Sequence, residues 1–187
     1  IETTTSGAGS KIIKSGIQHG YKVIFLCSNL DRYTNLGLEQ LSNFEIIITD
    51  TSSFEQIIST INIKNLKENL SGIISLSDSY VEIASKVAEY FNLTSSNSES
   101  LEIIRDKGKV RELFRDYEFS VKNKVIYDVK DLEEWKTFPA VSKSVSGTGS
   151  IDVKVSLYKD DLYKETKKML VKYGELLIEK YETGNLI

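Results

Sequence analysis

The residues with the clearest chemical potential lie between Phe138 and Ile151, where a lysine precedes a glycine-rich turn. The residues from Ala140 to Ser142 predict a short strand, so Lys143 would project from the strand end. Glycine at positions 147 and 149 permits positive φ values and a close approach of phosphate oxygens to the backbone. The pattern predicts a polyphosphate site, but not a Walker A loop, because the lysine precedes the glycines. The anion would sit in a concavity of backbone amides from Ser146, Gly147, Thr148, Gly149 and Ser150.

Length and composition predict a soluble protein with one domain, or with a small domain and part of another. The chain has 187 residues, of which 40% are hydrophobic, enough for a packed core. The 24 basic residues are spread along the chain and are outnumbered by 27 acidic ones, so neither a nucleic-acid partner nor a membrane partner is predicted. No apolar run is long enough to span a bilayer, and no signal peptide is recognisable. Cys27 is the only cysteine, which excludes an internal disulfide and favours a cytoplasmic location.

The two ends of the sequence suggest a piece of a longer protein. The chain starts at Ile1 rather than at a methionine, and it stops at Ile187 soon after Gly184. We therefore expect a truncated second domain, with the catalytic residues beyond Ile187.

The first part of the chain alternates strand and helix signals, which is typical of a parallel α/β sheet. Runs rich in β-branched and aromatic residues predict strands at 1–5, 21–27, 45–49 and 72–76. Amphipathic spacing predicts helices at 11–18, 53–61 and 79–91. Residues 1–95 are thus expected to form a Rossmann-like, doubly wound domain.

The second part has a different pattern. A polar, serine-rich connection at 94–100 and a charged helix at 101–115 predict a connecting region at 96–118. Strands are expected at 119–127, 140–142, 151–155 and 175–181, with helices at 132–135 and 159–173. Residues 119–187 should therefore form an incomplete α+β subdomain.

The turn before the first helix admits two interpretations. Gly7 and Gly9 resemble the start of a dinucleotide fingerprint, but Ile12 occupies the third glycine position. The turn is either purely structural or a substrate loop in which Ser6, Gly7 and Gly9 contact a small anion. Asp31 could likewise be a ribose partner or a solvated loop residue, and the incomplete fingerprint favours the latter.

A charged stretch from Arg105 to Arg111 also admits two interpretations. It could be the solvated face of a helix. Alternatively, Lys107 and Lys143 could both meet phosphate oxygens as flexible point charges. The strand that ends at Tyr181 would then border an adenine through Glu179 and the main chain of Lys180 and Tyr181.

Four segments in this order resemble the ATP-grasp superfamily of ligases, and the resemblance covers nearly the whole chain. Residues 1–95 resemble its pre-ATP-grasp domain, with 78–93 as a helix that the family shares. Asp106-Lys107 and the Pro139-x-x-x-Lys143 strand resemble the family's two phosphate-contacting lysine motifs. Residues 146–150 resemble its flexible glycine-rich loop, and residues 177–181 resemble the strand beside the adenine.

The resemblance implies an ADP-forming carboxylate–amine ligase in which ATP phosphorylates a carboxylate to an acylphosphate. The segments 3–7 and 28–33 are most similar to enzymes that join amino acids or related carboxylates. The family's magnesium ligands and its catalytic arginine would lie beyond Ile187, so this chain alone should not catalyse. No ribose carboxylate is assigned, because Asn185 follows Gly184. The expected partners are ATP, Mg²⁺, a small carboxylate and an amine, and a homodimer is among the expected assemblies.

Three alternatives stay open. A biotin carboxylase-like or carbamoyl-phosphate-type enzyme would phosphorylate bicarbonate instead. A non-catalytic nucleotide-binding module would have kept the fold without the magnesium carboxylates. A dinucleotide oxidoreductase is disfavoured by the incomplete fingerprint.

Overall fold

The computed structural model describes residues 1–37, 41–147, 149 and 151–184. The chain forms two compact units, Ile1–Leu101 and Glu102–Ile187. Each unit has its own sheet. The predicted domain limits at 95 and 118 stay predictions.

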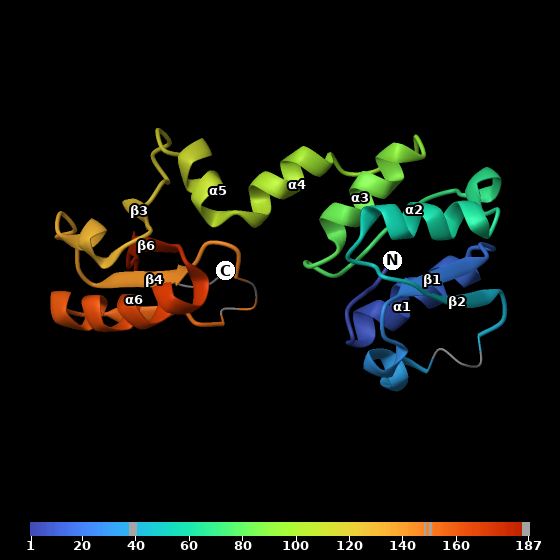
Figure 1. Ribbon diagram of the computed structural model, residues 1–187, viewed down its shortest axis with the longest axis horizontal. Helices are drawn as coiled ribbons and strands as arrows, with labels where there is room; N and C mark the ends of the chain where they lie inside the picture. The colour runs from blue at the N-terminus through green and yellow to red at the C-terminus, as the bar shows by residue number, and fades with distance from the viewer. Residues whose placement is uncertain (38–40, 148, 150, 185–187) are drawn as a thin grey trace. The chain divides into compact units, whose positions relative to one another are not determined.

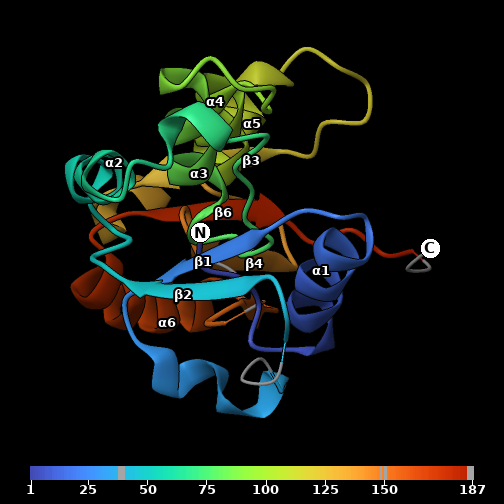
Figure 2. The same cartoon turned by 90° about the vertical axis from the view of Figure 1, so that its right-hand side faces the viewer.

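The first unit is built on a parallel strand pair, β1 (Val23–Cys27) and β2 (Phe44–Ile48), which lie side by side in Figure 2. Alternate side chains of β1 point to opposite faces. Phe25 and Cys27 pack with Ile13 of α1 (Gly7–Gln18), whereas Leu26 packs with residues of α2 (Phe54–Ile63) and α3 (Val81–Tyr90). Helices thus cover both faces, as a doubly wound fold requires. Two short 3₁₀ helices, η1 and η2, span Leu30–Leu36 and Lys67–Asn69.

The predicted strands at 1–5 and 72–76 are wrong as regular strands. The first segment does run beside β1, since Glu2 N–H donates to Leu26 O at 2.7 Å. Ile1 N also donates to Ile74 O at 3.0 Å, so the two segments are neighbours. These single bonds do not make the consecutive pairs of a ladder. Other elements of this unit match their predictions with shifted ends, except that the expected loop at 29–33 lies largely within η1.

The predicted single helix at 101–115 is also wrong, because Asp106 divides it. α4 (Ser98–Arg105) begins inside the expected connection, and α5 (Lys107–Leu113) follows. Asp106 has an extended backbone, and its carboxylate accepts the Lys109 N–H at 2.9 Å, so it acts as the N-cap of α5. The break places Lys107 at the first position of a new helix.

The second unit is an antiparallel sheet packed against α6 (Lys159–Tyr173), which occupies the predicted residues (Figure 1). The strand order is β3-β6-β4-β5. The strands are β3 (Asn123–Ile126), β4 (Ala140–Ser144), β5 (Lys154–Ser156) and β6 (Leu176–Lys180). The helix expected at 132–135 is instead a 3₁₀ turn, η3 (Val129–Leu132), that starts with a capping box at Asp128.

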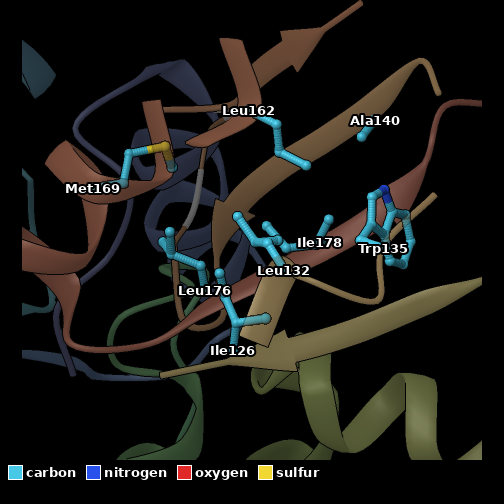
Figure 3. Packing of buried hydrophobic residues seen from close by; sticks show 8 residues of the cluster. All are labelled: Ile126, Leu132, Trp135, Ala140, Leu162, Met169, Leu176 and Ile178. Atoms are coloured by element: carbon cyan, nitrogen blue, oxygen red, sulfur yellow. The ribbon is translucent and has the colours of Figure 1, made fainter. Parts of the chain in front are cut away.

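The core of this unit lies on the α6 face of the sheet. Leu162 and Met169 of α6 contact alternate residues of the strands, and Trp135 closes the cluster. Figure 3 shows its eight buried side chains: Ile126, Leu132, Trp135, Ala140, Leu162, Met169, Leu176 and Ile178. Since side chains alternate along a strand, the residues between these core positions lie on the other face of the sheet. Lys143 and Glu179 are among them.

Candidate functional site

The candidate site lies on the sheet face opposite α6. In the antiparallel register, Lys143 of β4 pairs with Leu177 of β6, and Val141 pairs with Glu179. These four residues therefore project from the same face. α5 contacts β3 on this side: a Cβ at Gly108 would come within 2.9 Å of Val125, so only glycine lets the helix approach this closely. The face combines an apolar floor with charged side chains.

Lys107 reaches this face from the start of α5. Its backbone N–H donates to Val145 O at 3.1 Å, which ties the helix start to the end of β4. Its ammonium group donates to Val145 O at 3.3 Å and to Gly147 O. Burial lowers the pKa of Lys107, repulsion from Lys143 lowers it further, and Glu179 and Asp106 oppose the shift. The two lysines of the sequence motifs thus lie close enough to interact.

Lys143 and Arg111 share one buried carboxylate. Glu179 accepts Arg111 Nε at 2.5 Å through Oε1 and pairs with Lys143 Nζ through Oε2. The Glu179 side chain is 6% exposed, while those of Lys143 and Arg111 are 20% and 27% exposed. A buried carboxylate needs such partners, because an unpaired buried charge is costly. The cluster carries one net positive charge and faces partly open surface.

The glycine-rich turn follows β4 directly. Gly147 lies next to Ser144, whose Cβ would be 3.2 Å from an added Cβ, and its carbonyl accepts the Lys107 ammonium. Gly149 has φ 64°, a conformation that favours glycine. Ser146 is exposed. Thr148 and Ser150, also predicted as phosphate contacts, lie outside the described residues.

The predicted adenine strand, β6, lies inside the sheet between β3 and β4. The Lys180 N–H donates to Lys122 O, and the Tyr181 N–H donates to Pro139 O, each at 2.9 Å. These two amides are already paired in this structure. The adenine contact of Glu179, Lys180 and Tyr181 stays a prediction.

The predicted substrate loop lies in the first unit, at the start of α1. Ser6 is the N-cap residue, and its hydroxyl donates to Thr4 Oγ1 at 3.2 Å rather than capping the helix. A Cβ at Gly9 would come within 2.1 Å of Thr4 O, so Gly9 is required by packing. A Cβ at Gly7 would meet nothing within 4 Å. The structure thus accounts for Gly9, and a substrate role for Ser6 and Gly7 stays a prediction.

Arg111 is the residue of the second unit that sequence reasoning missed. It appeared only as part of a charged stretch. Its position four residues after Lys107 puts the two side chains on the same side of α5, which was the available signal. Its partner Glu179 lies 68 residues away in sequence, so the pairing is visible only in the fold.

Sequence reasoning also missed a buried carboxylate in the first unit. Glu2 is 1% exposed, and its Oε1 accepts Ser28 N–H at 2.7 Å, Ser28 Oγ at 3.0 Å and Thr51 Oγ1 at 2.7 Å. Its Oε2 accepts the Tyr33 hydroxyl. Burial acts to raise the pKa of Glu2, but these hydrogen bonds together outweigh it and lower the pKa. Glu2 thereby ties together the segments that follow β1 and β2.

The described residues contain no cluster of three histidine, cysteine, aspartate or glutamate side chains suited to a metal ion. The carboxylate nearest the two lysines, Glu179, is occupied by Arg111 and Lys143. This donor set does not fit magnesium, and we derive no step through a metal here. In the same described part, we find no helix whose length and apolar content would suit a bilayer span.

Similarity to known proteins is found at the level of structure. The sequence matches no family model, and no curated protein matches it significantly. An L-amino acid ligase from Bacillus licheniformis matches with a TM-score of 0.76 at 18% identity, over 98% of this chain and 44% of that chain.

Two further solved structures match over a similar extent. An N5-carboxyaminoimidazole synthetase from Staphylococcus aureus, complexed with ADP, matches with a TM-score of 0.71 at 16% identity, over 98% of this chain and 47% of that one. An N5-carboxyaminoimidazole ribonucleotide synthetase from Thermus thermophilus matches with a TM-score of 0.68 at 16% identity, over 97% of this chain and 46% of that one. The chain thus spans less than half the length of these proteins.

These likenesses define the class of fold. The chain has the fold of the N-terminal portion of ATP-grasp ligases, with a parallel sheet in one unit and an antiparallel sheet in the other. The fold expected from the four sequence motifs is confirmed.

Proposed function

We propose that the full-length protein is an ATP-dependent carboxylate–amine ligase and that its Glu102–Ile187 unit binds ATP. The observation that carries the proposal is the convergence of Lys107 and Lys143. The two lysines come from separate segments, influence each other's charge and flank the glycine turn. The shared fold supports it, since the matched proteins include an L-amino acid ligase and a synthetase complexed with ADP.

In this proposal the two ammonium groups neutralise the polyphosphate. Phosphoryl transfer depends mainly on positioning and on stabilisation of negative charge, and fixed cations provide both. Lys143 would approach from the strand end and Lys107 from the start of α5. Lys107 would exchange its contacts with the Val145 and Gly147 carbonyls for phosphate oxygens.

The glycine turn would close over the phosphates and exclude water. Exclusion of water protects an acylphosphate from hydrolysis before an amine can displace the phosphate. Magnesium is part of the proposal as a further source of neutralising charge, held by residues outside the described part. The acid and the amine are small molecules that the full-length protein would bind.

The reaction class is tested by ADP release from the full-length protein with ATP and magnesium, across a matrix of amino acids and small carboxylates. Release that requires one acid and one amine together supports the ligase. Release that requires bicarbonate instead would contradict the amino-acid assignment and indicate bicarbonate chemistry. ATP binding without release under any condition would indicate a non-catalytic module.

The site assignment is tested by Lys143→Met. We expect ATP affinity to fall by about tenfold or more while the fold persists, because a charge-assisted phosphate contact contributes roughly 1.5–3 kcal/mol. Lys154→Met is the matched control, since Lys154 is an exposed lysine of the neighbouring strand and pairs with Ser142, so it belongs to the α6 face. Equal ATP affinity and turnover in the two variants would contradict the assignment of Lys143.

A further inference from the structure

The charges around Glu179 do not cancel. Glu179 brings one negative charge, and its two oxygens are engaged by two cations, Arg111 and Lys143. Because the Glu179 side chain is 6% exposed, water cannot replace either partner effectively. The cluster therefore keeps one positive charge that Glu179 does not neutralise.

Without Arg111, the same carboxylate would have Lys143 as its remaining cation. A buried carboxylate attracts an adjacent ammonium strongly, because the local dielectric constant is low. Glu179 would then neutralise Lys143 and hold it on the sheet. The pair would carry no net charge, and an incoming phosphate would have to displace the carboxylate from the lysine.

We propose that Arg111 is a positioning residue that neutralises Glu179 and so leaves the charge of Lys143 available for a polyphosphate. This inference rests on the proposed nucleotide site. Arg111 suits the role because guanidinium stays charged at all physiological pH values and forms directional bonds to carboxylates. Its short helix is held against β3 at Gly108, so its reach to Glu179 is set by the packing of α5.

A merely structural role for Arg111 makes a different prediction. If Arg111 only stabilised the fold, its loss would affect charged and uncharged ligands alike, and removal of its partner Glu179 would not restore binding. If Arg111 balances charge, its loss should affect ATP far more than adenosine. Removal of the negative charge of Glu179 should then restore ATP binding.

The experiment compares the affinities of ATP and adenosine for the full-length protein and four variants: Arg111→Gln, Arg111→Lys, the double variant Arg111→Gln/Glu179→Gln, and Arg115→Gln. Arg115 is the matched control, because it lies one turn further along the chain and forms an exposed ion pair with Glu112. Unfolding followed by Trp135 fluorescence checks the fold of each variant, since Trp135 is the only tryptophan and is buried in the core of this unit.

We expect Arg111→Gln to weaken ATP binding roughly tenfold and adenosine binding by less than about twofold. The double variant should return to within about threefold of the wild-type ATP affinity, because Lys143 regains its free charge. Arg111→Lys should recover part of the loss because it keeps the charge, and Arg115→Gln should behave as wild type.

Three results would overturn the inference. Unchanged ATP affinity in Arg111→Gln would show that Lys143 does not depend on it. Equal losses for ATP and adenosine, or no recovery in the double variant, would assign Arg111 a structural role. If the wild type bound neither ATP nor inorganic tripolyphosphate, the proposed function itself would fail and this inference with it.

Discussion

Each unit contains one buried glutamate, and the two are satisfied in opposite ways. Glu2 in the first unit accepts one backbone amide and three hydroxyl groups, all of them uncharged. Glu179 in the second unit is held between two cations. Uncharged donors leave the negative charge in place and bind the surrounding segments together. Cations more than compensate the charge and leave a positive surface that suits an anion.

This contrast teaches that a buried carboxylate does not by itself indicate a ligand site. At Glu2 the partners come from segments that follow strands, so the carboxylate serves the fold. At Glu179 the partners are long cationic side chains that are partly exposed and can reach a ligand. The nature of the partners, rather than burial, separates the structural acid from the candidate functional one.

The largest expected effect on stability is that of Glu2→Ala. Truncation leaves four buried or half-buried donors without their acceptor, which we expect to cost about 3 kcal/mol of unfolding free energy. Cys27, the only cysteine, is fully buried in the adjacent β1, so its labelling by a thiol reagent reports opening of this unit. Labelling should be faster in Glu2→Ala than in Glu68→Ala, a control at an exposed glutamate. Equal labelling rates would contradict the structural role of Glu2.

The second prediction concerns acid sensitivity. The pKa of Glu2 is lowered in the folded state from its ordinary value of 4.5, so its ionisation stabilises the fold above that value. This stabilisation is lost as pH falls through the lowered pKa. Its neighbours do not titrate there, since burial and the Glu2 charge raise the pKa of Cys27 to about 11 and burial also raises that of Tyr33.

The wild type should therefore lose more stability on acidification than Glu2→Gln, which has no charge to lose. Urea unfolding followed by circular dichroism at about pH 7 and about pH 4 measures the difference. The effect should be smaller than that of truncation, because a protonated glutamate still fills its site. Parallel pH profiles for the two proteins would refute this account.

The smallest expected effect on stability is that of Glu179→Gln. The cations it releases are partly exposed and can turn to water, so we expect a loss of about 1 kcal/mol at low salt. The loss should shrink in high salt, because ions screen the repulsion between the freed cations. Trp135 fluorescence measures it, with Glu182→Gln as control, since Glu182 forms an exposed pair with Lys180. A larger loss than that of Glu2→Ala would reverse the comparison.

Part of the fold was predictable because local patterns coincide with the final structure. The helix at 159–173 has its predicted bounds, and the β-branched runs around Val23 and Phe44 form the expected parallel pair. Where local and tertiary signals differ, the predictions failed. The extended segments at 1–5 and 72–76 make single hydrogen bonds in place of a ladder, and the N-cap at Asp106 interrupts a continuous helical pattern.

The sequence by itself determined the ATP-grasp-like order of motifs: a lysine after an aspartate, a second lysine at a strand end, and glycines where the turn needs them. These are local properties, set by capping, side-chain alternation and backbone freedom. Only the tertiary structure decided which charges meet. Arg111 and Glu179 are far apart in the chain, as are Glu2 and Thr51, and they become partners because packing brings them to one buried place where each charge must find a donor.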